Sequence, residues 1–337
     1  QTMSDDPAME IVANCAKDVP CVAVLRGHDG PVSCCAFDAR SSLFCSGSED
    51  GSFKLWKSVD GDWKCVKTVD CGSAVTSCQF QPEGAAGLLC TGSADNLLRV
   101  WKALKGDCVT VLAGHKDRVS ACSFDPLNGD LVCSGSDDTS VRVWRVSKAK
   151  ELRHYKGHTS PITSVSYNPN GDLVASASQD RSVRIWSARD GKSVAVMEGH
   201  GGPVHGLAFH TKTEWLVSAS ADKTLRIWRE SDGNFLREVK GHKGAATCVA
   251  FDPAYGTLMA TAEADGLKGR TNAAWLWSFQ AGTRRTQIKE VLHINTLRGH
   301  ESKIRQLVFD REATLLATAS DDGTVRMWRL QDPAKAG

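Results

Sequence analysis

The chain has 337 residues, of which 41% are hydrophobic and 24% are charged, and its formal net charge is +2. This composition supplies enough apolar material for a folded core and excludes an intrinsically disordered chain. A general nucleic-acid or membrane-surface role would show as a strong basic excess, which the sequence lacks. The sequence also has no apolar run near the roughly 20 residues that a membrane-spanning helix needs, so membrane insertion is not expected.

Residues 1–18 contain the acidic segment MSDDPAME where a secreted protein would carry a basic and apolar signal. We expect them to form a flexible tail. The 13 cysteines include no CxxC pair and no cluster at zinc-ligand spacing, so no metal or cofactor is expected. This usage indicates a reducing compartment, cytoplasmic or alternatively nuclear. Ten cysteines lie in or beside apolar runs and are expected in the core: Cys21, Cys34, Cys35, Cys45, Cys65, Cys78, Cys90, Cys122, Cys133 and Cys248.

A repeated unit begins after this segment and fills nearly all of the remaining chain. Each copy starts with Gly-His, except that the second has Cys71 in the place of the histidine, and each ends in tryptophan. The starts are His28, Cys71, His115, His158, His200, His242 and His300, and the ends are Trp56, Trp101, Trp144, Trp186, Trp228, Trp277 and Trp328. The first six starts follow one another at 42 to 44 residues. A fixed period of this length indicates seven units that share one continuous core.

Each unit carries three or four short strand-like runs separated by turn residues, which is typical of an all-β fold. In the fifth unit these runs are VHGLAF, WLVSAS, TLRIW and FLREV. The last unit reaches Leu330 without a fourth run, whereas CVAVL at residues 21–25 has no unit before it. We expect these two ends to pair and close a ring, because closure removes exposed sheet edges. The predicted domain covers residues 19–331, followed by a tail at 332–337.

These units resemble the WD-repeat (WD40) family of β-propellers, whose unit runs from Gly-His through Ser/Thr-x-Ser-x-Asp to a strand that ends in Trp-Asp. The resemblance covers about residues 21 to 330. Six aspartates each precede their tryptophan by six positions: Asp50, Asp95, Asp138, Asp180, Asp222 and Asp322. The aspartate of the Trp-Asp pair is replaced by Lys, Arg or Ser in every unit. The implied fold is a seven-bladed propeller closed by an N-terminal strand that completes the last blade.

In this family the loop histidine, a strand hydroxyl, the turn aspartate and the tryptophan form a hydrogen-bonded chain within a blade. The resemblance implies five such tetrads here. Their members are His28, Ser46, Asp50 and Trp56; His115, Ser134, Asp138 and Trp144; His158, Ser176, Asp180 and Trp186; His200, Ser218, Asp222 and Trp228; and His300, Thr318, Asp322 and Trp328. Linking these groups avoids the cost of burying each one unsatisfied. The tetrad of the second unit is expected to be incomplete at Cys71.

Peptide ligands of WD-repeat proteins often rest on the central opening of the face that carries the Gly-His loops. The resemblance assigns three positions per blade to this opening, and none holds an aromatic residue. This absence disfavours an aromatic clamp for arginine or methyl-lysine. Five of these positions hold a serine or threonine of the first strand: Ser33, Thr76, Ser120, Thr163 and Thr247. The candidates for partner binding are eight charged and polar residues among these positions, and an ordinary solvated rim is the alternative. They are Glu49, Arg118, Asp137, Gln179, His205, Lys303, Arg305 and Asp321.

The sixth unit breaks the period, since His242 and His300 are 58 residues apart. The excess lies in two polar, basic insertions, GLKGRTN and GTRRTQIKE. Tolerated loop growth is one interpretation. The other is a partner contact through their basic residues, Lys268, Arg270, Arg284 and Arg285.

Catalytic and phosphate-binding motifs are missing from the sequence, which has no GxSxG, GxxxxGK[ST], GxGxxG or HExxH. We therefore expect a non-catalytic scaffold or adaptor of a eukaryotic-type complex, monomeric on its own, that binds proteins or peptides on its faces. One alternative is the substrate receptor of a ubiquitin ligase, although Trp186-Ser187-Ala188-Arg189 lacks the aspartate of the Trp-Asp-x-Arg motif. Others are a nucleic-acid-binding module through the sixth-unit insertions and an enzyme that uses the central opening.

Overall fold

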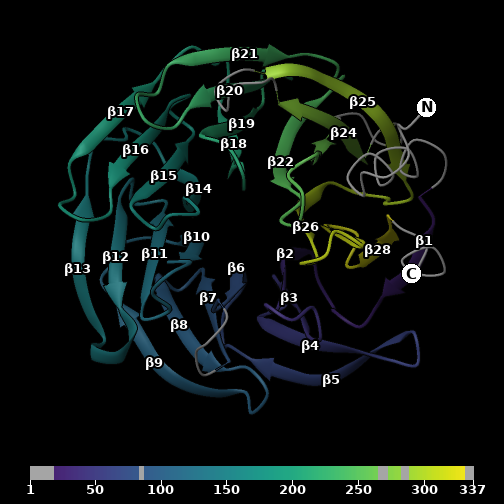
Figure 1. Cartoon of the computed structure of the whole chain (residues 1–337). Helices are drawn as coiled ribbons and strands as arrows, with labels where there is room; N and C mark the ends of the chain where they lie inside the picture. Colours follow the sequence, from purple (N-terminus) through teal and green to yellow (C-terminus); the bar gives the residue numbers. More distant parts are fainter. Residues whose placement is uncertain (1–18, 83–86, 265–271, 282–287, 331–337) are drawn as a thin grey trace.

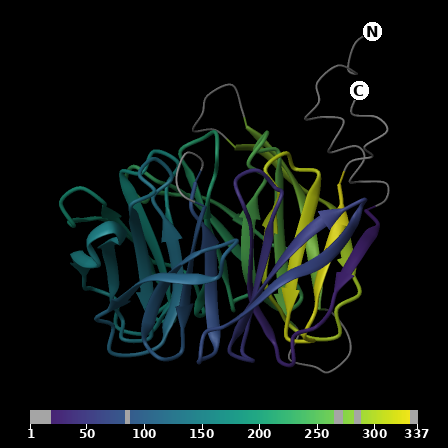
Figure 2. The same ribbon diagram turned by 90° about the horizontal axis from the view of Figure 1, so that it is seen from below.

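The computed structural model describes residues 19–82, 87–264, 272–281 and 288–330. These residues form seven four-stranded antiparallel sheets and one 3₁₀ helix, η1 (Val146–Lys148). The sheets surround a central opening as the blades of a propeller (Figure 1), and a view turned by 90° shows them side by side in one thick ring (Figure 2). The prediction of a seven-bladed, all-β ring is confirmed.

The strands of each blade follow one another outward from the opening (Figure 1). The innermost strands, which number blades one to seven, are β2 (Val32–Phe37), β6 (Val75–Phe80), β10 (Val119–Phe124), β14 (Ile162–Tyr167), β18 (Val204–Phe209), β22 (Ala245–Phe251) and β26 (Ile304–Phe309). The second strands are β3 (Phe44–Ser48), β7 (Leu88–Ser93), β11 (Leu131–Ser136), β15 (Leu173–Ser178), β19 (Trp215–Ser220), β23 (Leu258–Ala264) and β27 (Leu315–Ser320).

The third strands are β4 (Ser52–Val59), β8 (Leu97–Lys102), β12 (Val141–Arg145), β16 (Val183–Ser187), β20 (Leu225–Arg229), β24 (Ala273–Ala281) and β28 (Val325–Arg329). The outermost strands are β5 (Asp62–Asp70), β9 (Asp107–Ala113), β13 (Lys150–Tyr155), β17 (Ser193–Met197), β21 (Phe235–Val239), β25 (Ile288–Arg298) and, in blade seven, β1 (Cys21–Leu25).

Ring closure follows the expected pairing of the first strand with the last. β1 lies antiparallel to β28, with Leu25 opposite Val325 and Ala23 opposite Met327. The Arg329 N–H also donates to the carbonyl of Pro20 at 3.0 Å. Blade seven thus takes its outermost strand from one end of the domain and its other three from the opposite end.

The core consists of seven apolar clusters, one at each junction between neighbouring blades. Each cluster contains the tryptophan that closes the later unit, as Trp228 of blade five packs with Ile185 and Val183 of blade four. The repeated tryptophan therefore joins its own blade to the one before it. Burial of such a side chain contributes roughly 3 kcal/mol or more.

The outermost strands have one face open, and this corrects two of the cysteine predictions. Cys21 on β1 and Cys65 on β5 are exposed, whereas the other eight predicted core cysteines are buried. Their flanking residues are apolar, but alternate side chains of an outer strand point to solvent. Every cysteine in the described ranges is a free thiol.

Blade six has the longest hairpin of the ring, formed by β24 and β25. Residues 265–271 and 282–287, on either side of β24, lie outside the described ranges. The four basic residues predicted as a partner contact, Lys268, Arg270, Arg284 and Arg285, belong to these segments, and their role stays a prediction.

Candidate functional site

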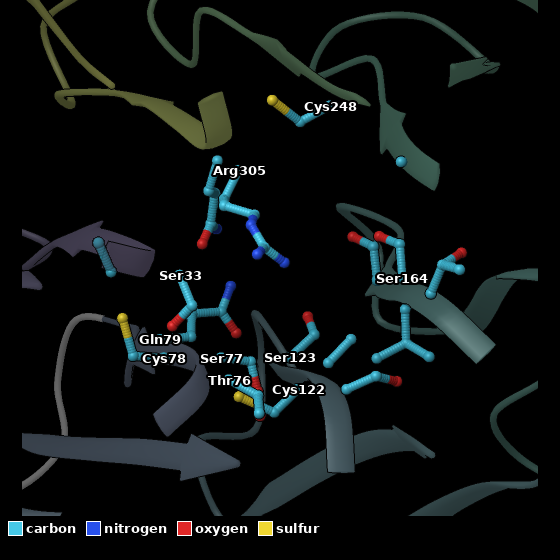
Figure 3. Close-up of a pocket in the computed structure, with 18 of the residues that line it drawn as sticks. Ser33, Thr76, Ser77, Cys78, Gln79, Cys122, Ser123, Ser164, Cys248 and Arg305 are labelled. Carbon is cyan, nitrogen blue, oxygen red and sulfur yellow. The ribbon is translucent and has the colours of Figure 1, made fainter. Parts of the chain in front are cut away.

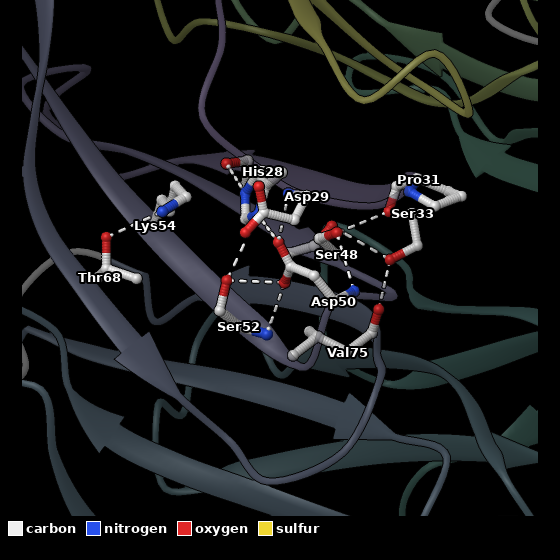
Figure 4. Close-up of polar contacts among 12 residues, drawn as sticks. His28, Asp29, Pro31, Ser33, Ser48, Asp50, Ser52, Lys54, Thr68 and Val75 are labelled. Atoms are coloured by element: carbon white, nitrogen blue, oxygen red, sulfur yellow. Dashed lines mark hydrogen bonds and ion pairs between the residues drawn. The ribbon is translucent and has the colours of Figure 1, made fainter.

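The polar groups on the Gly-His face fall into two sets, and the first is the tetrads. In blade one, His28 Nδ1 lies 2.8 Å from Asp50 Oδ2 (Figure 4), and Nε2 lies 2.8 Å from Ser46 Oγ. Trp56 Nε1 donates to the same hydroxyl at 2.8 Å. Because an indole only donates and a carboxylate only accepts, His28 donates from Nδ1 and accepts at Nε2.

The structure brings all four members together in the same way in the other four predicted tetrads, in blades three, four, five and seven.

Titration within a tetrad agrees with this direction. Burial alone would raise the pKa of Asp50, but hydrogen bonds from Ser52 and His28 outweigh it and lower that pKa to about 2. Burial lowers the pKa of His28, and attraction to Asp50 opposes this only in part. At neutral pH the imidazole is therefore neutral and the carboxylate ionised. Since His28 and Asp50 make these hydrogen bonds within their own blade, we infer a structural role for them.

Blade two replaces the missing histidine with a guanidinium. Arg99 NH2 donates to Asp95 Oδ2 at 2.6 Å, and Trp101 Nε1 donates to Thr91 Oγ1 at 2.8 Å. Cys71, at the histidine position, is buried in the junction with blade one. The expected gap is thus real at Cys71, but the turn aspartate keeps a partner that sequence reasoning did not foresee.

Blade six builds its tetrad with a glutamate. His242 Nδ1 lies 3.3 Å from Glu263 Oε2, and Nε2 lies 3.0 Å from Thr261 Oγ1. Trp277 donates to the same threonine at 2.8 Å. Glu263 comes only two positions after the strand hydroxyl, where other blades have their aspartate four positions after it. A search for aspartate at the usual spacing finds Asp265 instead, which is why the sequence alone missed this tetrad.

Arginines two positions before the tryptophan form a feature that sequence reasoning also missed. Their guanidinium carbons lie 5.9 to 6.0 Å from the centres of the indole rings, within cation–π range. The pairs are Arg142 with Trp144, Arg184 with Trp186 and Arg226 with Trp228. In blade six Trp275 takes this position and stacks on Trp277, with ring centres 5.7 Å apart.

The second polar set lies near the start of each innermost strand, at its second residue or, in blade six, at its third. In five blades this residue is a serine or threonine whose hydroxyl donates to a carbonyl of the next innermost strand, as Ser33 does to Val75 (Figure 4). We call these the interblade hydroxyls. They belong to Ser33, Thr76, Ser120, Thr163 and Thr247, and their acceptors are Val75, Val119, Ile162, Val204 and Ile304.

The family resemblance placed these hydroxyls among the ligand-contact positions, but the structure uses them between blades. Blades five and seven are the exceptions, because His205 and Arg305 occupy the equivalent positions. A hydroxyl link is therefore missing from the junction of blades five and six and from that of blades seven and one.

Arg305 instead binds two carboxylates at the mouth of the opening. Its Nε donates to Asp321 Oδ1 at 2.5 Å, and its NH2 lies 3.5 Å from Glu49 Oε1 of blade one. Figure 3 shows the Arg305 side chain projecting into the central cavity. The structure thus brings together three of the predicted rim residues across the junction that closes the ring.

The other predicted rim residues line the same cavity, which has a volume of about 640 Å³. They are Arg118, Asp137, Gln179, His205 and Lys303. Burial raises the pKa of Asp137, and the neighbouring Arg118 opposes the rise. The rest of the wall is rich in hydroxyls, amides and thiols, among them Ser77, Gln79 and Cys122 (Figure 3).

The described ranges contain neither a metal-binding cluster nor a membrane-spanning helix. No group of three or more His, Cys, Asp or Glu side chains there is arranged to hold a metal ion. Among the same residues, no helix has the length and apolar character needed to cross a membrane.

A closed ring of four-stranded blades with internal His, hydroxyl, carboxylate and Trp chains defines a WD-repeat propeller. The sequence profile of the WD domain, G-beta repeat, matches residues 19–57, 63–102, 106–145, 149–187, 191–229 and 292–329. These segments cover well over half of the chain, and the protein belongs to the WD40 family. The unmatched stretch between residues 229 and 292 holds most of blade six, where the tetrad and the spacing both depart from the repeat.

Individual relatives match over short stretches only. Serine-threonine kinase receptor-associated protein of Homo sapiens is 47% identical over 45 residues, which are 12% of this chain and 13% of that protein. A ribosome biogenesis protein BOP1 homolog of Brugia malayi is 37% identical over 60 residues, 18% of this chain and 9% of the relative. A periodic tryptophan protein 2 homolog of Mus musculus is 37% identical over 62 residues, 18% and 7%. Each alignment therefore spans a small part of both chains.

Proposed function

We propose that this protein is a non-catalytic scaffold or adaptor that binds a protein or peptide partner at the mouth of its central cavity. The observation that supports this most directly is the substitution of two interblade hydroxyls by His205 and Arg305. Each replacement gives up a link within the ring and places a larger polar side chain at the cavity. Because these two side chains do not link neighbouring blades as the hydroxyls do, they can contact a bound partner.

The nature of the family supports the same proposal at a coarser level. The propeller carries its polar groups on rigid strands, and binding surfaces built on rigid elements need little reorganisation on binding. Two relatives are named for a receptor and for ribosome biogenesis. We propose a comparable place in an assembly for this chain, in the cytoplasm or the nucleus, with the chain itself a monomer.

The test is affinity purification of the tagged full chain from its native organism, followed by mass spectrometry. We expect reproducible partners for the natural sequence and their loss in Arg305→Glu, which reverses the charge at the mouth of the cavity. Lys105→Glu is the matched control, because Lys105 is exposed in the turn between β8 and β9.

The two possible failures are distinct. Recovery of no reproducible partner would overturn the scaffold function. Identical partner lists for the natural chain and Arg305→Glu would leave the scaffold function standing and overturn the mouth of the cavity as its site.

A further inference from the structure

Of the two basic residues that blade seven places at the mouth of the cavity, Arg305 has ion-pair partners in the described part of the chain and Lys303 has none there. The two rim carboxylates of blades seven and one, Asp321 and Glu49, bind Arg305. Lys303 lies two residues before Arg305, and its ammonium group forms no hydrogen bond or ion pair within the ranges that the structure describes. Arg305 already has its carboxylate partners, whereas Lys303 has none among these residues. An anionic group from outside the protein would therefore stabilise the charge of Lys303 more than that of Arg305.

The surroundings of Lys303 are basic. Burial lowers the pKa of Lys303, the charge of Arg305 lowers it further, and Asp321 opposes both. His205, from blade five, is partly buried, and its pKa is lowered first by burial and then by the charge of Lys303. The same cavity wall carries Arg118 and Asp137 of blade three, which offset each other. Arg118 and Arg305 are thus offset by carboxylates, whereas the ammonium group of Lys303 has no ion-pair partner among the described residues.

Further polar groups of the cavity wall add donors without adding negative charge. Ser77 Oγ and Arg118 Nε are buried in the described ranges and have no hydrogen-bond partner, and both residues line the cavity. Figure 3 shows Ser77, Ser123 and Ser164 around the space into which Arg305 projects.

We propose that the mouth of the cavity selects an anionic side chain of a partner peptide, a carboxylate or a phosphate, with Lys303 as its direct ion-pair partner and with His205 and Arg305 beside it. This inference rests on the proposed function, since it names the chemistry of the partner at the same site. A cationic side chain would meet Lys303 and Arg305, and it would find Asp321 and Glu49 already bound. A phosphate fits especially well, because its three oxygens accept from several donors at once.

The test uses four degenerate peptide pools that differ only at one fixed central residue: phosphoserine, glutamate, serine or arginine. Binding of each pool to the full chain is measured by fluorescence polarisation. We expect the phosphoserine or the glutamate pool to bind at least about tenfold more tightly than the serine pool, and the arginine pool to bind most weakly. The comparison of the two anionic pools tells which of the two groups is preferred.

Lys303→Gln is the decisive variant, because it removes the charge without breaking an ion pair. We expect it to abolish the preference for the anionic pools while the melting temperature stays unchanged. Lys105→Gln, the control, should keep the preference. A second variant, His205→Ser, should weaken anion binding and leave the ring intact.

Equal binding of all four pools, binding of none, or an unchanged preference in Lys303→Gln would each overturn the anionic ligand. The proposed scaffold function would survive any of these results if affinity purification still recovers partners that Arg305→Glu loses. It fails only on that separate measurement.

Discussion

Glu230 is a buried carboxyl group directly after β20 of blade five. It stands two residues after Trp228, where four other blades have Ala103, Val146, Ala188 and Leu330. Only 8% of Glu230 is exposed, and its Oε2 has no hydrogen-bond partner in the described ranges. Burial, together with the nearby charges of Asp172 and Glu214, raises the pKa of Glu230 to about 7.

This raised pKa predicts that Glu230→Ala stabilises the protein in a pH-dependent way. In the unfolded chain the glutamate ionises near its ordinary pKa of 4.5, but in the folded protein it holds its proton until about pH 7. The natural protein therefore loses stability as the pH rises between these values, by up to about 3 kcal/mol. Urea unfolding at pH 8 should show most of this gain in Glu230→Ala, and the gain should shrink towards pH 4.5. A gain that is equal at both pH values would contradict this account.

Glu263 gives a second prediction at the level of a single side chain. Its carboxylate reaches His242 Nδ1 and accepts from the backbone N–H of Lys243 at 2.9 Å. Glu263→Asp shortens the side chain by one methylene, which leaves these buried donors unsatisfied and should cost about 1 to 3 kcal/mol. Denaturant unfolding measures the cost, with Glu301→Asp, at an exposed position, as the control. Unchanged stability in Glu263→Asp would show that the blade-six tetrad contributes nothing.

At the scale of the strand, the interblade hydroxyls explain how successive blades keep their register. Each joins one innermost strand to the next, between residues that are 41 to 43 positions apart in four blades and 57 apart in blade six. The sequence showed these serines and threonines but gave no reason to separate them from ligand contacts. Only the position of the acceptor carbonyl on the following blade makes that separation.

His205→Thr should install the link that is missing between blades five and six. By analogy with Thr163 and Val204, the new hydroxyl would donate to the carbonyl of Ala246 and add about 1 kcal/mol to the free energy of unfolding. The complementary variant Thr163→Ala removes an existing link and should cost a similar amount. Both are measured by urea unfolding. A destabilised His205→Thr would mean that His205 itself supports the junction.

Prediction from sequence succeeded where the repeat determines the answer. The number of blades, the four strands of the fifth unit and the closing strand at residues 21–25 follow from periodicity and turn residues, because each unit solves the same packing problem. It failed where a blade uses a different residue in its tetrad. Arg99 binds the turn aspartate of blade two, which has no loop histidine, and Glu263 takes the place of the turn aspartate in blade six. It also failed where a role depends on the neighbouring blade, as it does for the interblade hydroxyls.

On the scale of the whole molecule, stability depends on the pairing of β1 with β28. Deletion of residues 1–25 removes β1 and exposes the edge of β28, so we expect the truncated chain to unfold or aggregate. Deletion of residues 1–15 leaves β1 in place and should have no such effect. Size-exclusion chromatography and thermal unfolding of the two truncations measure the difference. A monomeric, cooperatively folding chain without residues 1–25 would contradict a closing role for β1.

The pairing of β1 with β28 also has a consequence for folding during synthesis on the ribosome. Leu25 and Val325 face each other in the finished blade but are made 300 residues apart. At a synthesis rate of about 5 to 20 residues per second, β1 waits roughly 15 to 60 seconds for its partner. The first six blades can assemble in sequence during that interval, whereas the seventh is completed only after Arg329 has left the exit tunnel. During synthesis, β1 therefore has no partner strand in its own blade until β28 has been made.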